Sequence, residues 1–324
     1  EANLDTRGVY TFSDDTAGAP FSAHPRVEPD GTLWNFGYLS SANLLVLWHI
    51  DRNGKLQKVG KIDAAPITMV HDFVVTQRHI VLLIAPFHFT ESDSESFLQA
   101  HQWNPHRVLV VDKDDFSSYQ WFELPAQWVF HFGNAWEDKA GVIRFDAPRY
   151  DDPSVMTVNF REIMRGNTLP ISALRHHSYR IDTRTGRCSE EPCLSANIQS
   201  EFPCVDPRVS CRQYSKVVML TYSTQQPAPT RVLLNEVSRF DLTSGKLDSY
   251  RYPETQIPEE HLYVPDLSAQ PEQGGWVIGS ALDWKEQRMI LNAFDARSIN
   301  DGPVATATLP YAMPLGLRVR CWRG

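Results

Sequence analysis

HIDRNGKLQKV, residues 49–59, is the stretch that decides the fold class. An apolar segment ends at Asp51, a short polar turn with Asn53 and Gly54 follows, and a second extended segment returns. Gly or Asn supplies the backbone dihedral angles that a tight antiparallel turn needs. The same unit recurs as RIDTRTGRC, residues 180–188, and as RFDLTSGKLDSY, residues 239–250. The chain is therefore expected to consist of antiparallel hairpins.

The periodicity is typical of β-strands along the whole chain. Segments rich in Val, Ile, Tyr, Phe and Trp predict strands at residues 44–50, 79–85, 107–111, 119–124, 141–145, 179–181, 217–222, 231–240, 276–281 and 289–294. Only residues 94–102 and 160–164 have a helical pattern, and both segments are short. The prediction is an all-β fold with small helical insertions.

The Asp residues that end these strands suggest a repeat. Asp51, Asp112, Asp182 and Asp241 are separated by 61, 70 and 59 residues. A propeller blade needs about 40–45 residues, so the gaps fit blades with long insertions. A β-propeller is the preferred architecture, with a two-sheet sandwich as the alternative, although a sandwich rarely needs so many hairpins. No linker divides residues 1–324, which we expect to form a single domain.

Composition excludes some classes of function. The net charge of −8 argues against nucleic acid as a partner, because a phosphate-binding surface needs a cationic field. The longest apolar runs, such as residues 80–85, are far too short to span a membrane, while a peripheral membrane contact stays open. The five Cys lack the C-x2-C spacing of a structural zinc site, so free thiols in a reducing cytoplasm are the main expectation, with a disulfide or a metal site as alternatives.

Three of the eleven histidines have distinctive surroundings, each beside an apolar, strand-like run. They are His24 in SAHPRVEPDG, His71 in MVHDFVVTQRHIVLLIAP and His131 in FHFGNAWED. Each alone is weak evidence, and the other eight are interpreted as surface or core residues. His176 and His177 are adjacent, so on a strand they would face opposite sides. If the three histidines converge, an all-imidazole set indicates a transition metal, and the chain is a candidate metalloenzyme.

Taken together, these segments resemble the carotenoid cleavage oxygenases, a family that includes the lignostilbene dioxygenases. Two further segments agree: QSEFPCVDPR, with Glu201, and EEHLYVPD, with Glu260. The resemblance implies a seven-bladed β-propeller in which His24, His71 and His131 bind Fe(2+), while Glu201 and Glu260 orient histidine ligands. It also implies a dioxygenase that uses O2 to cleave a conjugated C=C bond of a carotenoid, apocarotenoid or stilbene into two carbonyl products.

The sequence departs from the family pattern at both ends. In LPYAMPLGLRVRCWRG, residues 309–324, Arg318 stands where the family has a fourth histidine ligand. A guanidinium cannot bind a metal ion. Only 23 residues precede His24, where the family has further blades and another glutamate. We therefore expect an N-terminally truncated propeller with an incomplete ring. The alternative to an active oxygenase is a non-catalytic or decayed propeller homologue.

Overall fold

The computed structural model describes residues 5, 6, 8–86, 105–165, 167, 174–223 and 234–316. Its strands form five four-stranded sheets, each an antiparallel meander in sequence order. The first sheet contains β1 (Arg26–Val27), β2 (Leu33–Leu39), β3 (Leu44–Ile50) and β4 (Leu56–Asp63). The second contains β5 (Phe73–Val75), β6 (His79–Ile84), β7 (His106–Asp112) and β8 (Tyr119–Leu124).

The remaining three sheets repeat this arrangement. The third contains β9 (Ala135–Glu137), β10 (Val142–Tyr150), β11 (Leu174–Asp182) and β12 (Arg187–Glu191). The fourth contains β13 (Ser200–Cys204), β14 (Lys216–Thr221), β15 (Glu236–Asp241) and β16 (Leu247–Arg251). The fifth contains β17 (Gln256–Pro265), β18 (Gly275–Asp283), β19 (Arg288–Asp295) and β20 (Pro303–Leu309).

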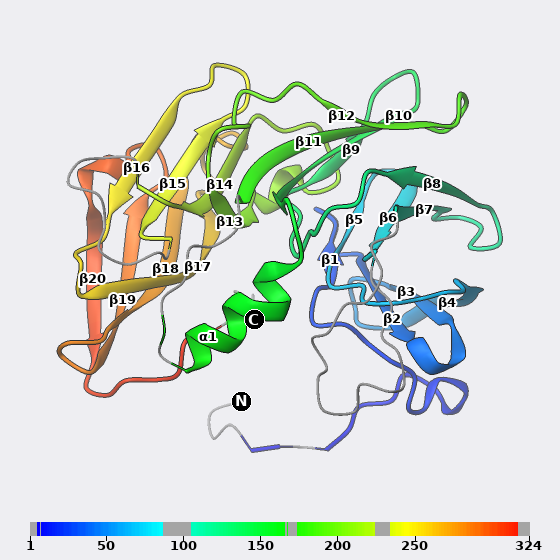
Figure 1. Cartoon of the computed structure of the whole chain (residues 1–324), viewed down its shortest axis with the longest axis horizontal. Helices are drawn as coiled ribbons and strands as arrows, with labels where there is room; N and C mark the ends of the chain where they lie inside the picture. The colour runs from blue at the N-terminus through cyan, green and yellow to red at the C-terminus, as the bar shows by residue number, and fades with distance from the viewer. Residues whose placement is uncertain are drawn as a thin grey trace.

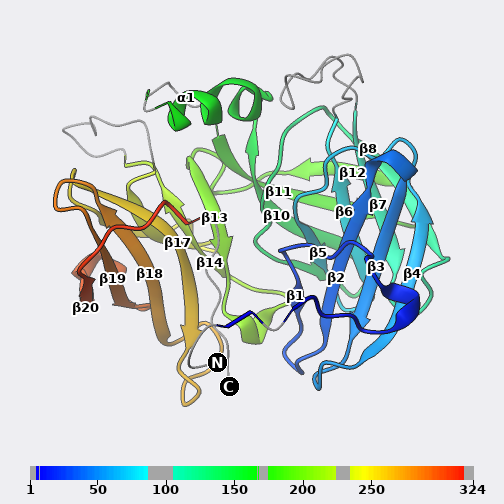
Figure 2. The same ribbon diagram turned by 90° about the horizontal axis from the view of Figure 1, so that it is seen from below.

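The five sheets follow one another around an arc, as the blades of a propeller do. Figure 1 shows the arc running from β1–β4 to β17–β20, with an opening between the first and last sheets, and Figure 2 shows the same arrangement from below. The first strand of each sheet lies innermost, and β1 contacts β5, β5 contacts β9 and β13 contacts β17. The predicted all-β propeller with an incomplete ring is confirmed, and the sandwich is not observed.

The predicted Asp turns mark equivalent positions in the blades. Asp51, Asp112, Asp182 and Asp241 each follow or end the third strand of a sheet. In each case Oδ1 accepts a hydrogen bond from the backbone N–H two residues later, at 2.7–3.1 Å. Asp295 does the same at the end of β19, with Arg297 N at 2.9 Å, and was not recognised as part of the repeat. The carboxylate therefore closes the same hairpin in every blade.

Apolar side chains fill the spaces between neighbouring sheets. In β6, Ile80 and Leu82 pack towards the first sheet, whereas Val81 and Leu83 pack towards the third. A separate cluster that includes Val218, Val277 and Phe294 joins the fourth and fifth sheets. Both faces of the middle strands are thus buried, which explains why they appear in the sequence as continuous apolar runs.

Little of the described chain is helical. The predicted helix at 160–164 is α1 (Phe160–Met164), which follows the π-helical turn η3 (Val155–Asn159). Short 3-10 turns lie at η1 (Asp14–Thr16), η2 (Ser40–Ala42), η4 (Pro207–Val209) and η5 (Ile299–Asp301). The helix predicted at 94–102 lies outside the described residues. Among those that are described, no helix has the length and apolar character needed to cross a membrane.

Candidate metal centre

Three loops that lead into inner strands bring the histidines together. His24 precedes β1, His71 precedes β5 and His131 precedes β9. One ring nitrogen from each lies within 4.8 Å of the others. The ring centroids are 4.6 Å apart for His24 and His71, 5.3 Å for His24 and His131, and 5.0 Å for His71 and His131. The structure therefore joins side chains that the sequence separates by 47 and 60 residues.

Glu201 holds one of these rings in a defined orientation. His131 Nδ1 lies 2.8 Å from Glu201 Oε2, and both side chains are largely buried. The same carboxylate oxygen accepts a hydrogen bond from Phe202 N at 2.8 Å. A carboxylate accepts a hydrogen bond from the Nδ1–H group, which leaves Nε2 of His131 with its lone pair. This is the tautomer that can bind a metal ion through Nε2.

A buried ion pair, absent from the sequence prediction, ties the three loops to one another. Arg26 Nη2 lies 2.5 Å from Asp72 Oδ2, and these residues follow His24 and His71 closely in the chain. The guanidinium also donates to Phe132 O at 3.0 Å, and Phe132 N donates to Asp72 Oδ2 at 3.1 Å. The pair therefore links the segments around all three histidines, and Asp72 Oδ1 lies 3.8 Å from His24 Nδ1.

Two inner strands are interrupted where they reach the centre. The register of β13 shifts between Glu201 and Cys204, and the register of β17 shifts between Pro258 and His261. Phe202 has φ of +56°, which is unusual for a residue with a side chain. Such irregularities redirect side chains and concentrate near functional sites. They lie where the sequence carries the two predicted glutamates.

Glu260 lies on the wall of the same small cavity as two of the histidines. The cavity has a volume of about 60 Å³, and its lining includes His24, His131, Phe202 and Glu260. The charge of Glu260 is one of the influences that raise the pKa of His131. The structure thus brings Glu260 to the centre, where its charge acts on the same ring that Glu201 holds.

The protonation states differ between two of the rings. Burial lowers the pKa of His71 to about 4, with a further contribution from His131, so this imidazole is neutral at physiological pH. Burial alone would also lower the pKa of His131, but the carboxylates of Glu201, Asp72 and Glu260 together outweigh burial and raise it. Burial and the Glu201 charge also raise the pKa of Tyr150 well above its usual value. Neutral imidazoles are the form that binds transition metals.

The donor set is consistent with a divalent transition metal. Three imidazole nitrogen donors converge, and no carboxylate oxygen belongs to the converging set found in the described part of the chain. Metal–nitrogen bonds of about 2.0–2.2 Å would need the three rings to close slightly around an ion. The anchored His131 tautomer and the neutral His71 both suit this role.

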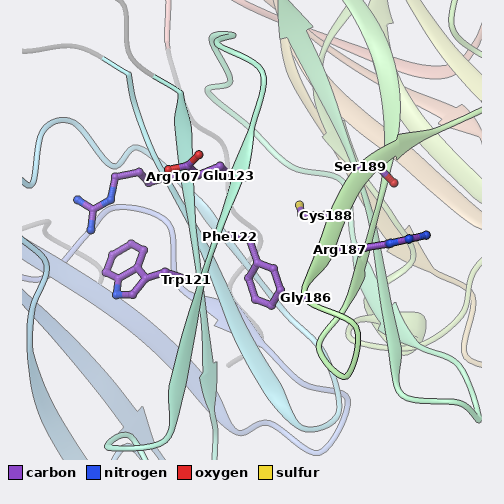
Figure 3. Close-up of a pocket in the computed structure, with 8 residues that line it drawn as sticks. All are labelled: Arg107, Trp121, Phe122, Glu123, Gly186, Arg187, Cys188 and Ser189. Carbon is purple, nitrogen blue, oxygen red and sulfur yellow. The ribbon is translucent and has the colours of Figure 1, made fainter.

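A larger hollow lies away from the histidines. It has a volume of about 790 Å³ and opens between the outer strands of the second and third sheets. Figure 3 shows Arg107, Trp121, Phe122 and Glu123 on one side and residues 186–189 on the other. The Arg107 guanidinium lies 4.0 Å from the centroid of the Trp121 ring. None of the three converging histidines lines this hollow, so it is separate from the candidate centre.

Comparison with known proteins places the chain in a family. The family model for retinal pigment epithelial membrane protein matches residues 1–318. The chain belongs to this family, the carotenoid oxygenases. Carotenoid 9,10(9',10')-cleavage dioxygenase 1 of Arabidopsis thaliana is 26% identical over 340 residues, covering 98% of this chain and 60% of that relative. The chain therefore spans about 60% of the length of this carotenoid oxygenase.

Solved carotenoid oxygenases have the same fold. The crystal structure of Pseudomonas brassicacearum lignostilbene dioxygenase matches with a TM-score of 0.83 and 25% identity, covering 97% of this chain and 68% of that one. A cobalt-substituted structure of the Synechocystis apocarotenoid oxygenase matches with a TM-score of 0.83 and 23% identity, covering 98% of this chain and 68% of that one. Carotenoid oxygenases are metal-dependent, and the family resemblance expected from the sequence is confirmed.

Sequence reasoning missed the residues that support the histidines, whereas it assigned the position of the family's fourth ligand to Arg318. Arg26 and Asp72 stand within two positions of predicted ligands, and this proximity is the signal that could have identified them. Arg318 lies outside the described residues. The last described residue is Gly316. Its backbone N–H donates a hydrogen bond to the carboxylate of Glu259, the residue before Glu260.

Proposed function

We propose that this chain forms the catalytic part of a non-haem Fe(2+)-dependent dioxygenase that cleaves a conjugated C=C bond into two carbonyl products. The observation that carries the proposal is the convergence of three histidine nitrogens within 4.8 Å, one ring being held by a buried carboxylate. Relatives named as carotenoid-cleavage and lignostilbene dioxygenases support the reaction class. This chain covers 60% of the length of the Arabidopsis relative, so the activity of that longer protein is assigned to this chain only as a proposal.

His24, His71 and His131 would hold the ion. Bound iron would supply the site at which O2 is activated for addition to the double bond. Glu201 would keep the proton of His131 on Nδ1 and leave Nε2 available to the ion, and Glu260, on the wall of the small cavity, would orient another ligand. The Arg26–Asp72 ion pair would fix the spacing of the three loops.

An apolar, conjugated small molecule is the proposed substrate, with O2 as the second reactant. Aromatic side chains border the centre: Phe202 lies 5.1 Å from His131 and Phe130 lies 5.3 Å from His71, between ring centroids. Phe160 of α1 stacks on Phe130 with centroids 5.7 Å apart and is 41% exposed. Apolar walls of this kind suit a polyene or stilbene and exclude water.

A non-catalytic propeller homologue is the second candidate, and one observation favours it. Arg318 stands at the position where the family resemblance expects the fourth histidine. The backbone N–H of Gly316, two residues before Arg318, donates a hydrogen bond to the carboxylate of Glu259. A cation in place of that neutral ligand would raise the cost of binding a dication. Metal binding without turnover would be the property of such a homologue.

The test is turnover by the 324-residue chain. The protein is loaded with Fe(2+) without oxygen, then exposed to O2 with a carotenoid, an apocarotenoid and a stilbene, and carbonyl products are measured by mass spectrometry. His131→Ala is the inactive comparison, and His177→Ala, outside the centre, is the matched control. Carbonyl products that depend on His131 support the proposal. Iron bound without product from any of the three substrates would overturn it in favour of the non-catalytic homologue.

A further inference from the structure

A second buried constellation of polar side chains lies in the third sheet, outside the metal centre. His176 of β11 and Asp146 of β10 are 0% and 1% exposed, and His176 Nε2 lies 2.7 Å from Asp146 Oδ2. Beyond the other ring nitrogen lie Ser195 and Cys193, in the segment that connects β12 to β13. Neither the family motifs nor the proposed oxygenase reaction uses these four residues.

Asp146 is fixed as a hydrogen-bond acceptor. Its Oδ1 accepts from Asn134 N at 3.0 Å and from the hydroxyl of Tyr214. With its carboxylate ionised, Oδ2 accepts the proton of His176 Nε2. The histidine is therefore oriented with Nδ1 turned away from Asp146, towards Ser195 and Cys193. An acid, a histidine and a nucleophile in this sequence of contacts form the arrangement that activates a side chain for nucleophilic attack.

His176 Nδ1 faces two side chains that can act as nucleophiles. Ser195 Oγ is 2.5 Å from Nδ1, and Cys193 Sγ is 3.9 Å from it. The Ser195 hydroxyl also contacts the sulfur of Cys193, so it can relay a hydrogen bond from the imidazole to the thiol. Ser195 is fully buried, whereas Cys193 is partly exposed and its neighbour Leu194 is 63% exposed. A reagent from solvent can therefore reach the sulfur more readily than the hydroxyl.

The ionisation of Cys193 differs from that of the other described thiols. Burial would raise its pKa, but hydrogen bonds from His176, Ser178 and Ser195 lower it to about 7. Burial likewise opposes protonation of His176, yet Asp146 and Cys193 raise its pKa to about 9. Burial raises the pKa of the remaining described thiols, to about 12 for Cys188 and Cys204 and to about 11 for Cys211.

Two further ionisable groups lie close by, Tyr214 against Asp146 and His177 next to His176 in the chain. Tyr214, whose pKa is raised well above its usual value by burial and Asp146, stays neutral and donates to Asp146. His177 follows His176 on β11 and lies 3.3 Å from Glu190 through its Nδ1. Burial lowers the pKa of His177, so its ring is neutral at physiological pH. The pKa shifts favour a protonated His176 ring beside an ionised Cys193 sulfur, and the Asp146 carboxylate lies against that ring.

We propose that Cys193 is a nucleophilic thiolate and a modification site at which hydroperoxides form a sulfenic acid, with Asp146, His176 and Ser195 as its positioning residues. The thiolate attacks one peroxide oxygen, the S–O bond forms as the O–O bond breaks, and sulfur is oxidised by two electrons. The leaving hydroxide or alkoxide takes a proton from His176 through the Ser195 hydroxyl. A proton donor next to sulfur matters for this reaction, because the leaving oxygen is strongly basic, whereas alkylation needs no acid.

Alkylation with iodoacetamide tests the thiolate independently of iron. Modification of each cysteine peptide of the full chain is followed by mass spectrometry between about pH 5 and pH 9. Cys193 should react with a midpoint near pH 7 and, at that pH, at least about tenfold faster than Cys188, Cys204 and Cys211. Reaction no faster than that of these three thiols would overturn the proposal.

Variants separate a reactive constellation from ordinary packing. His176→Gln should slow alkylation of Cys193 at pH 7 by about tenfold and move its midpoint upward by about one pH unit. His177→Gln, at the adjacent position on the same strand, should leave both unchanged. If His176→Gln does not fold, Ser195→Ala should give a smaller shift in the same direction. An unshifted midpoint in the folded variants would show that His176 and Ser195 do not activate the thiol.

Peroxide treatment tests the modification itself. Folded protein is exposed to hydrogen peroxide in the presence of dimedone, which traps sulfenic acids, and adducts are assigned to individual cysteines. Adducts should form at Cys193 before they form at any other described cysteine and should fall about tenfold in His176→Gln. Trapping at the other cysteines but not at Cys193 would contradict the proposal, whatever the outcome of the oxygenase assays.

Discussion

Arg26 Nη2 lies 2.5 Å from Asp72 Oδ2, although the two residues are 46 positions apart in the chain. The side chain of Asp72 is 4% exposed and that of Arg26 is 22% exposed, so water screens the pair weakly. Each partner also bonds to the backbone around residue 132. The loops that carry the three histidines are thus held together by protein groups alone.

Arg26→Gln should destabilise the fold because it leaves the buried Asp72 carboxylate without its partner. Removing one member of a buried ion pair costs about 3–5 kcal/mol, and the partial exposure of Arg26 places the expected loss in the free energy of unfolding near the lower value. Urea denaturation measures it. Arg165→Gln is the control, because the exposed Arg165–Glu162 pair should contribute about 0–1 kcal/mol. Equal losses in the two variants would contradict the role of the pair.

Glu201→Gln should weaken metal binding while leaving the three imidazoles in place. The Gln side-chain amide accepts a weaker hydrogen bond from His131 Nδ1–H than the Glu201 carboxylate, which lies 2.8 Å away. Loss of such a supporting carboxylate lowers metal affinity by about 10–100-fold. Titration with Co(2+) measures the change, and Glu190→Gln, which removes a carboxylate 3.3 Å from His177, is the matched control. Identical Co(2+) affinities for the two variants would show that Glu201 does not support a metal-binding histidine.

Gly133→Ala should distort the segment that follows His131. A Cβ at position 133 would lie 2.2 Å from Asp146 Oδ2 and 2.6 Å from its Oδ1, which are bonded to neighbouring groups. Overpacking of this kind costs about 1–3 kcal/mol, and metal affinity should fall as well. Gly54→Asn is the control, because φ at Gly54 is +80° with open space around it, and Asn tolerates that conformation. Wild-type stability in Gly133→Ala would contradict the close contact between position 133 and the Asp146 carboxylate.

His106 should make stability depend on pH. Burial lowers its pKa to about 3 from an ordinary value of 6.5, and its Nδ1 has no hydrogen-bond partner among the described residues. Between these pH values the unfolded chain binds a proton that the folded chain does not. The free energy of unfolding therefore falls as pH drops from 6.5 towards 3, by up to about 1.4 kcal/mol per pH unit.

Unfolding measurements between about pH 5 and pH 7 test this, because ordinary carboxylates stay ionised in that range. His106→Leu should remove a large part of the slope. The remainder is expected from His71 and His261, because burial lowers the pKa of each to about 4. A variant with the wild-type slope would show that His106 does not titrate in this way.

The strands that the sequence predicted share a physical property. Segments such as β6 and β14 have both faces covered by neighbouring sheets, so they appear as apolar runs. The missed strands include every innermost one. These are short, as in β1 and β9, or carry polar side chains to the centre, as in β13 with Glu201 and β17 with Glu260. Strand propensity is weak where side chains are chosen for the metal centre rather than for packing, so the sequence pattern does not predict these strands.

The three histidines were predictable because family motifs surround them, but their supporting contacts were not. The Arg26–Asp72 pair depends on loops brought together by different sheets, and no sequence spacing encodes that approach. His176 was interpreted as a surface or core residue, and Cys193 as an ordinary thiol. The antiparallel pairing of β10 with β11 sets His176 beside Asp146, and no local sequence pattern encodes this contact.

Metal stoichiometry decides most directly whether His24, His71 and His131 form one centre. The purified chain and its single His→Ala variants are dialysed against Fe(2+) without oxygen, and bound metal is measured by elemental analysis. The wild-type chain should bind about one ion, as three converging imidazoles can, and each of the three variants should lose most of it. His177→Ala should bind as the wild type does. Unchanged metal content in all three variants, or no metal in the folded wild-type chain, would contradict the account.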